Sequence, residues 1–268
     1  MDAISFYIPF LYSYTSRFKS LFKLVSWGII YVIPTLYFFL FQSSFYEIEN
    51  YISYIWAISL IYTLYEIGYI QNDFETVKEE ANPTLRFSKE MFEYYEEHKK
   101  QIYIFRLLLG VLCSSLLYLT FKKDILYFLV LVWSLLLIYQ LYNKVRCRLN
   151  LYLHFLLVSI RYCSYFMIFV FHVNYWLLGV AFICFPLINF LERASEQRFE
   201  IKRIKILISD RSKIPLFRVW YYFVMSICSV FFILGGVNEC YFIPIWGYLF
   251  FRFIILQIGI FHNRVTYG

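Results

Sequence analysis

The chain has 268 residues, of which 61% are hydrophobic, 24% are aromatic and only 16% are charged, and its formal net charge is +7. Soluble domains carry about a quarter charged residues, so this composition excludes an ordinary soluble domain and indicates an integral membrane protein. The aromatic residues are spread through apolar runs and do not line a basic surface, which argues against a nucleic-acid-binding protein.

The N-terminal segment DAISFYIPFLYSYTSRFKSLF has no short basic start and no small-residue cleavage site, so we do not expect a signal peptide. We expect it to lie at the membrane interface or to form part of a ninth apolar segment. Eight apolar runs follow, each close to the length of about 20 residues that a helix needs to cross the hydrocarbon. The runs are Leu24–Phe41, Tyr51–Ile70, Ile102–Phe121, Ile125–Asn143, Leu149–Phe171, Tyr175–Leu191, Val219–Gly235 and Tyr241–Phe261.

These runs lack the strict alternation of barrel strands, and a chain in lipid must satisfy its own backbone hydrogen bonds. The predicted fold class is therefore all-α, a polytopic transmembrane helical bundle with eight to nine spans. Residues 1–268 contain no linker rich in Pro, Gly or Ser, so a single membrane domain is expected. The six cysteines show no metal-ligand spacing, which argues against a zinc site and a disulfide framework.

Two long polar loops, 71–101 and 192–218, are separated by four runs, so both are expected on the same side of the membrane. Most of the lysine and arginine residues lie on that side, whereas Lys122 and Lys123 fall on the other. Because basic residues accumulate in cytoplasmic loops, we expect both loops and both termini to be cytoplasmic.

The first loop opens with a cluster of polar residues, Asn72, Asp73, Glu75 and Glu79. Glu75 and Glu79 share one helical face if the preceding helix continues past Gly68, and like charges so placed repel by a few tenths of a kcal/mol. The arrangement therefore favours a positively charged partner. Alternatively, such charge-rich loops are solvated faces that only mark topology.

The second loop repeats the pattern, because Glu192, Glu196 and Glu200 follow at intervals of four residues. Carboxylates at the mouth of a helical bundle can hold Mg²⁺, which usually shares its oxygen ligands with substrate phosphates. Nearby arginine and lysine side chains can take the remaining phosphate oxygens. The two loops together are therefore predicted to form a site that stabilises a departing diphosphate.

These two clusters resemble the motifs of the UbiA superfamily of intramembrane prenyltransferases, which read N-D-x-x-D-x-x-x-D and D-x-x-x-D. Asn72 and Asp73 match the first motif directly, and Glu75 and Glu79 match its D-x-x-x-D portion with one residue fewer before it. The pair Glu192 and Glu196 matches the second motif, again with Glu for Asp. The resemblance implies a UbiA-like bundle with its active site in the two cytoplasmic loops.

The stretch EEANPTLRF resembles the continuation D-x-x-H-P-x-K-x-x-R-P in the decaprenyl-phosphate phosphoribosyltransferase branch of that superfamily. Pro83 and Thr84 fall in place, Asn82 stands at the His position, Leu85 at the Lys position, and Arg86 follows. The resemblance implies a Mg²⁺-dependent enzyme. Its metal ligands would be Asp73, Glu75, Glu79, Glu192 and Glu196, with Asp73, Glu75 and Glu196 as catalytic residues. Its substrate-binding residues would be Asn72, Arg86, Lys202 and Arg203.

Arg161 and Arg252 lie inside apolar runs, where a charge is expensive and usually functional. We expect one or both to line a polar cavity and to contact an acceptor phosphate. The alternative is a structural ion pair, for which Glu66 is the nearest candidate partner by depth.

The first choice of function is transfer of a phosphoribosyl group from phosphoribosyl diphosphate to polyprenyl phosphate, for cell-envelope polysaccharide synthesis at a bacterial inner membrane. That acceptor is already an anion and needs no general base, and none of the four histidines falls in either motif. The second choice is prenyl transfer from a polyprenyl diphosphate to an aromatic or quinone precursor. A third choice, of another class, is a non-enzymatic lipid-linked sugar carrier or flippase partner. The expected partners are an isoprenoid lipid substrate, a diphosphate-bearing donor and membrane lipids, without nucleic acid, and the oligomeric state stays open.

Overall fold

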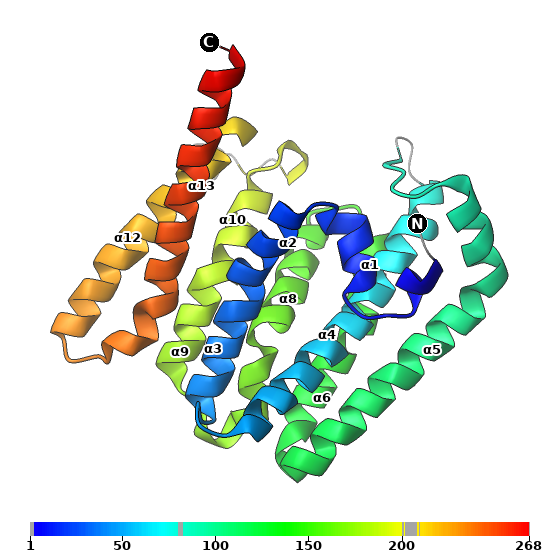
Figure 1. Ribbon diagram of the computed structural model, residues 1–268, viewed down its shortest axis with the longest axis horizontal. Coiled ribbons are helices and arrows are strands. Elements are labelled where there is room, and N and C mark those ends of the chain that lie inside the picture. The colour runs from blue at the N-terminus through cyan, green and yellow to red at the C-terminus, as the bar shows by residue number, and fades with distance from the viewer. Residues whose placement is uncertain (1–2, 80–82, 200, 202–207, 209, 268) are drawn as a thin grey trace. The chain divides into compact units, whose positions relative to one another are not determined.

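The computed structural model describes residues 3–79, 83–199, 201, 208 and 210–267, and the regular structure in these residues is entirely helical (Figure 1). The predicted all-α class is confirmed. Backbone contacts divide the chain into two compact units, unit 1 with Met1–Val173 and unit 2 with Asn174–Gly268, and each is described by itself. That residues 1–268 form a single domain stays a prediction.

Unit 1 holds the longest helices of the described chain. Its α-helices are α1 Leu11–Ser13, α2 Leu21–Trp27, α3 Ile33–Gln42, α4 Ile48–Phe74, α5 Lys89–Phe121, α6 Leu126–Trp133, α7 Leu135–Lys144 and α8 Leu149–Cys163. Its 3-10 and π segments are η1 Ala3–Phe6, η2 Tyr14–Phe18, η3 Gly28–Val32, η4 Thr76–Glu79, η5 Lys122–Ile125 and η6 Ser164–His172.

Unit 2 consists of one continuous helical segment, Tyr175–Ala194, followed by a helical hairpin of α12 and α13. Its α-helices are α9 Tyr175–Phe182, α10 Ile188–Ala194, α12 Ile214–Leu234 and α13 Ile243–Tyr267. Its short segments are η7 Ile183–Leu187, η8 Gln197–Phe199, η9 Arg211–Lys213 and η10 Glu239–Phe242.

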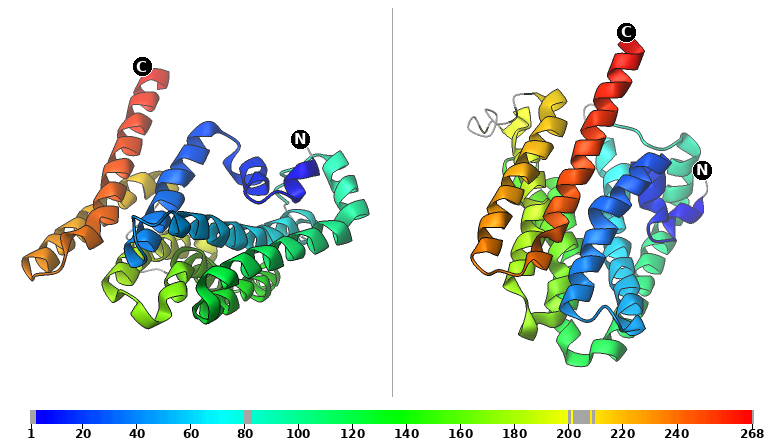
Figure 2. Two further views of the ribbon diagram at one scale, coloured as in Figure 1. Left: turned by 60° about the horizontal axis from the view of Figure 1, so that its bottom comes forward. Right: turned by 60° about the vertical axis from the view of Figure 1, so that its left-hand side comes forward.

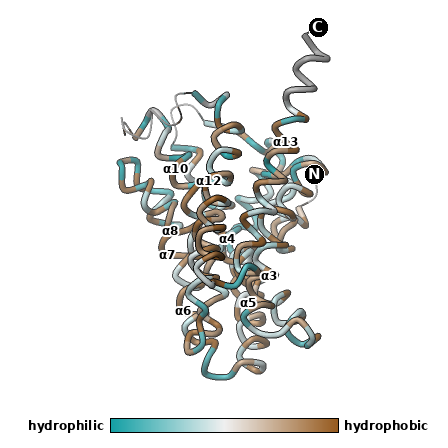
Figure 3. The backbone as a smooth tube through the Cα atoms, turned by 90° about the vertical axis from the view of Figure 1, so that its left-hand side faces the viewer, coloured by the Kyte–Doolittle hydropathy of each residue, from teal (hydrophilic) through white to brown (hydrophobic). Residues whose placement is uncertain are grey.

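Within the described ranges, six helical segments are long and apolar enough to cross a membrane. They are Leu21–Gln42, Lys89–Lys144, Leu149–His172, Tyr175–Ala194, Ile214–Leu234 and Glu239–Gly259. The chain is therefore an integral membrane protein, and Figure 3 shows apolar residues along the middle of its helices and hydrophilic ones at several connecting turns. The cytoplasmic side of the termini and the bacterial inner membrane stay predictions.

All eight predicted runs are helical, but the predicted count of eight to nine spans is not confirmed. Two features account for the difference between the eight predicted runs and the six helical segments. The segment Lys89–Lys144 contains α5 and the pair α6–α7, which turn back on each other at η5 (Figure 1). Helix α4 is 27 residues long but is not among the six, because its tyrosines and Glu66 lower its mean hydropathy.

The N-terminal segment folds into the short helices η1, α1 and η2, which are too short to form a further span. Phe6 and Tyr12 from this segment are fully buried in a cluster with Phe74 from α4 and Tyr95 from α5. The segment is therefore held on α4 and α5 by aromatic burial, and it brings polar groups to the end of α4.

Helix α4 runs beside α5 and α7, and most of its side chains are buried (Figure 2). Its close approach to α7 takes place at Gly68, where a Cβ atom would lie 2.1 Å from Cγ of Tyr139. The Tyr139 ring is held edge-on against Tyr65 with ring centroids 5.0 Å apart, and Asn143 donates a hydrogen bond of 3.2 Å to the carbonyl of Gly68. A glycine is therefore needed at this contact.

We expect Gly68→Ala to destabilise the protein by about 1–3 kcal/mol, because the added methyl group forces the Tyr139 ring out of its place. Thermal unfolding in detergent micelles measures the effect. The matched control is Gly179→Ala in α9, where nothing lies within 4 Å of the new Cβ. The control should be neutral or stabilise by up to about 1 kcal/mol, the difference in helix propensity. Equal stability of Gly68→Ala and the wild type would contradict the close contact.

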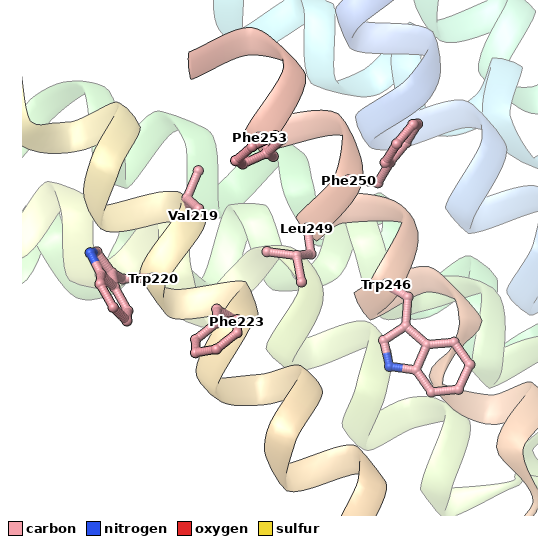
Figure 4. A pocket seen from close by; sticks show the side chains of 7 residues that line it. All are labelled: Val219, Trp220, Phe223, Trp246, Leu249, Phe250 and Phe253. Atoms are coloured by element: carbon pink, nitrogen blue, oxygen red, sulfur yellow. The ribbon is translucent and has the colours of Figure 1, made fainter. Parts of the chain in front are cut away.

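In unit 2, α12 and α13 lie side by side, and Trp246 donates a 3.1 Å hydrogen bond to the hydroxyl of Ser229 across them. An apolar hollow of about 430 Å³ lies between these helices (Figure 4). It is lined by Val219, Trp220, Phe223, Trp246, Leu249, Phe250 and Phe253. Its lining carries no charged side chain, so it supplies no group that could bind a phosphate.

Candidate functional site

Asp73 lies in the last turn of α4 and is the centre of a cluster of charged groups. Its side chain is only 2% exposed. Nη1 and Nη2 of Arg17 donate to Oδ2 and Oδ1 at 2.9 and 3.0 Å, which is a bidentate pair. Tyr12 donates its phenolic hydrogen to Oδ2 at 2.9 Å, and Nε of Arg86 lies 3.4 Å from Oδ1. Two guanidinium groups therefore share one carboxylate, with a net charge of +1.

Two members of the cluster, Arg17 and Tyr12, have pKa values raised by their surroundings. Burial opposes the charge on Arg17, but the Asp73 carboxylate outweighs it and raises the pKa of the guanidinium above its ordinary value. Burial, followed by the negative charge of Asp73, raises the pKa of the Tyr12 phenol well above its ordinary value. Tyr12 is therefore a permanent donor to Asp73, and Arg17 is a permanent cation.

Arg86 leaves donors available at the surface of this cluster. Its side chain is 35% exposed, and its two terminal nitrogens have no hydrogen-bond partner among the described residues. Guanidinium groups bind phosphate oxygens through paired donors. Arg86 therefore fits its predicted role as a binding residue for an anionic substrate, although that role stays a prediction.

A series of contacts between arginine and tyrosine side chains leads from the cluster to the Leu149–His172 span. The guanidinium of Arg17 lies over the Tyr69 ring at 4.3 Å, Tyr69 meets Tyr65 edge-on at 5.2 Å, and Arg161 lies over the Tyr65 ring at 4.8 Å. We call these four residues the arginine–tyrosine line. Cation–π contacts stabilise a guanidinium away from water. The line thus places a second cation in the middle of the Leu149–His172 span.

The helical face predicted for Glu75 and Glu79 is wrong, because α4 ends at Phe74 and the chain continues as the 3-10 segment η4. Glu75 turns toward α5, where it accepts hydrogen bonds from Tyr95 and Tyr103 and pairs with Lys99 at 2.9 Å. Glu79 is exposed. The two carboxylates of the predicted motif therefore point to different surroundings.

Burial raises the pKa of Glu75, but the hydrogen bonds from Tyr95, Lys99 and Tyr103 outweigh this effect and lower the pKa below its ordinary value of 4.5. A carboxyl with a lowered pKa in the folded state adds stability above its ordinary pKa, and this stability is lost as the pH falls through the folded pKa. Glu75 is therefore expected to stabilise the fold near neutral pH and to cease doing so in acid.

We expect Glu75→Gln to be less stable than the wild type near neutral pH, and the difference in stability to shrink as the pH falls below 4.5. Thermal unfolding in detergent over a series of pH values measures the difference. Glu93→Gln is the control, since Glu93 is 66% exposed in its pair with Lys89. A difference between wild type and Glu75→Gln that stays constant into acid would contradict the hydrogen-bonded carboxylate.

Unit 2 contains a second carboxylate with two arginines nearby. Nε and Nη2 of Arg218 donate to the two oxygens of Glu192 at 2.6 and 2.7 Å. Arg252 in α13 lies within electrostatic reach of both Arg218 and Glu192. Arg252 is thus near a carboxylate in its own unit.

The second predicted helical face is also interrupted, because α10 ends at Ala194. Glu196 lies beyond that end and pairs with Nε of Arg198 at 2.8 Å. Glu200 lies outside the described residues, as do Lys202 and Arg203. The prediction that Glu192, Glu196 and Glu200 share one helical face is therefore wrong for Glu196.

The placement of the predicted metal ligands does not fit a resident Mg²⁺ ion. Asp73, Glu75, Glu192 and Glu196 each have a cationic partner within 3 Å. The described part of the chain contains no group of three or more His, Cys, Asp or Glu residues that could hold a metal. Mg²⁺ needs free carboxylate oxygens in an octahedral arrangement. The role of Mg²⁺ stays a prediction that the side chains, as they lie, do not favour.

Glu66 has a different partner from the one predicted. Nη1 of Arg106 donates to Oε2 of Glu66 at 2.7 Å, and both side chains are 0% exposed. Nε of Arg106 donates to the carbonyl of Phe6 at 2.6 Å, and the backbone nitrogen of Ser13 donates to Oε1 of Glu66 at 2.8 Å. The predicted pairing of Glu66 with Arg161 or Arg252 is therefore wrong. This pair anchors the N-terminal segment that carries Tyr12 and Arg17.

Sequence reasoning missed Arg17 and Tyr12, which it treated only as topology and lead-in residues. The positive charges of Arg17 and Lys19 in an otherwise apolar and aromatic N-terminal segment were the one available signal. The amide nitrogen of Asn72 lies 3.4 Å from Oδ1 of Asp73, and its role in substrate binding stays a prediction. Comparison of the chain with protein-family models, curated proteins and solved structures finds no match, so its function is inferred from this geometry.

Proposed function

We propose that the protein is an intramembrane transferase that acts on an isoprenoid substrate and releases diphosphate. Our first choice is transfer of a phosphoribosyl group from phosphoribosyl diphosphate to polyprenyl phosphate, for cell-envelope polysaccharide synthesis. The observation that carries the proposal is the arginine–tyrosine line of unit 1, which begins at the Arg17–Asp73–Arg86 cluster and ends at Arg161.

The two ends of this line suit two phosphorylated substrates. The guanidinium of Arg161 lies over the ring of Tyr65. Tyr65 lies two turns before Asp73 on α4, about 12 Å along the helix axis. A donor diphosphate would bind at the end of α4, where Arg86 is partly exposed. The phosphate of a lipid acceptor would bind deeper, at Arg161, with its isoprenoid chain in the membrane. A charge held in mid-span is expensive, which favours a functional role for Arg161.

The chemistry needs few groups from the protein. An oxygen of the acceptor phosphate forms a bond to the anomeric carbon of the donor, the bond from that carbon to the diphosphate oxygen breaks, and diphosphate leaves with the electron pair. Arg17 and Arg86 neutralise the negative charge that builds on the leaving oxygen. Because the acceptor is already an anion, the reaction requires no general base.

The test is a transfer assay with purified protein in lipid vesicles, labelled phosphoribosyl diphosphate and polyprenyl phosphate. A labelled lipid supports the proposal. Product only with a polyprenyl diphosphate and an aromatic acid would overturn the first choice and leave prenyl transfer. Transport of a lipid-linked sugar without either product would favour a carrier. Arg161→Gln should raise the KM for polyprenyl phosphate about tenfold or more, as expected for loss of a charged hydrogen bond, while Lys123→Gln serves as a control.

A further inference from the structure

We infer that the positive charge that binds phosphate in unit 1 comes from Arg17 and Arg86, and that Asp73 holds these guanidinium groups in place without coordinating a metal. Inorganic diphosphate should therefore bind without a divalent cation. The inference rests on the proposed function for its physiological ligand. It departs from the Mg²⁺ site that the sequence predicts.

The oxygens of Asp73 are already occupied by hydrogen-bond donors. Oδ2 accepts from Arg17 and Tyr12, both at 2.9 Å, and Oδ1 accepts from Arg17 at 3.0 Å with Arg86 at 3.4 Å. A Mg²⁺ ion would have to displace a bidentate guanidinium from a carboxylate that is 2% exposed. Mg²⁺ also keeps several waters, for which such a buried carboxylate offers little access.

The cluster has a net charge of +1, and the terminal nitrogens of Arg86 are hydrogen-bond donors that a ligand could use. Arg86 is 35% exposed and Arg17 is 18% exposed, whereas the Asp73 side chain between them is only 2% exposed, so the arginines present more surface to a ligand than the carboxylate does. The terminal nitrogens of Arg86 donate to nothing among the described residues, while its Nε faces Asp73. A planar guanidinium fixed at one edge presents its other edge to phosphate oxygens.

Unit 2 contains a second carboxylate whose oxygens are already occupied. Glu192 accepts hydrogen bonds of 2.6 and 2.7 Å on its two oxygens from Arg218. Mg²⁺ is bound through free oxygens of one or two carboxylates, together with waters and substrate phosphates. Glu192, like Asp73, therefore has an arginine where a metal ion would bind.

The experiment is calorimetric titration of inorganic diphosphate into the full-length protein in detergent, with EDTA or with Mg²⁺. We expect the dissociation constant in EDTA to lie within about threefold of that with Mg²⁺, and Arg86→Gln to weaken binding about tenfold or more. Asp73→Asn should keep binding within about threefold or tighten it, because it removes a negative charge and no donor. Lys89→Gln is the control, since Lys89 is 88% exposed. Binding that disappears in EDTA and returns with Mg²⁺, or that Asp73→Asn abolishes while the variant stays folded, would overturn the inference.

The transfer assay separates this result from the proposed function. Diphosphate binding in EDTA without a transfer product from either donor supports the arginine site and refutes the transferase. Transfer activity together with diphosphate binding that requires Mg²⁺ supports the transferase and refutes the arginine site.

Discussion

Replacement of Arg106 by methionine is expected to destabilise the protein by about 3–5 kcal/mol, the cost of leaving a buried charge without its partner. Arg106 and Glu66 are both fully buried, so no water can replace the lost guanidinium. The same side chain donates to the carbonyls of Ser5, Phe6 and Ile8. Its removal should therefore also release the N-terminal segment from α4 and α5.

Two measurements check this expectation. Thermal unfolding in detergent reports the loss of stability, and limited trypsin digestion reports faster cleavage after Arg17 and Lys19. The double variant Glu66→Leu with Arg106→Met should recover part of the loss, because no unpaired charge remains. Lys78→Met is the matched control. Its pair with Glu96 is about half exposed, at 50% and 53%, and should contribute no more than about 1 kcal/mol. Unchanged melting and digestion of Arg106→Met would refute the anchoring role.

The helices could be predicted from the sequence because lipid leaves the backbone no other partner for its hydrogen bonds. Each apolar run forms helical structure, and each could be predicted from its own residues without knowing which helices pack against it. Helix ends were less certain. The spacing of the carboxylates suggested that the helices continue past Phe74 and Ala194, but the chain leaves the α-helical conformation at both points. A difference of a few residues there changed which carboxylates share a face.

The ion pairs could not be predicted from the sequence. Arg106 lies inside the predicted run Ile102–Phe121, but only Arg161 and Arg252 were singled out as charges within apolar runs, and no partner was expected for Arg106. The identity of that partner depends on how α4 packs on α5, which no local pattern specifies. The pair of Arg17 and Asp73 joins residues 56 positions apart, through an N-terminal segment with no strong signal of its own.

The carboxylates of the two polar loops predict a metal site only while their partners are unknown. A motif gives the type and spacing of carboxylates, but it does not give the donors that fold onto them. In the structure, Asp73 meets two arginines, Glu75 meets two tyrosines and a lysine, and Glu192 meets one arginine directly. These partners decide whether a carboxylate can accept a metal ion, and each came from a different part of the chain.

Asp73→Asn should lower kcat for the proposed transfer about a hundredfold while the KM for the donor stays within about threefold, because misplaced catalytic groups cost rate more than binding. Asparagine keeps the size of the side chain but cannot hold two guanidinium groups by charge. Arg17 and Arg86 would still bind diphosphate, as argued above, but would no longer be fixed where charge develops on the leaving oxygen. Steady-state kinetics with labelled phosphoribosyl diphosphate measures this separation of kcat from KM.

Asp73→Glu distinguishes positioning from mere folding, since it restores the charge one methylene further from the backbone. We expect it to recover about tenfold of the lost rate, whereas a purely structural defect would leave both variants equally inactive. Glu93→Gln is the control, because that carboxylate is 66% exposed on α5, where it pairs with Lys89. A rise in KM at unchanged kcat would instead make Asp73 part of substrate binding, directly or through a metal. The proposed role of Asp73, to orient Arg17 and Arg86, is supported only if Asp73→Asn lowers kcat and Asp73→Glu restores part of it.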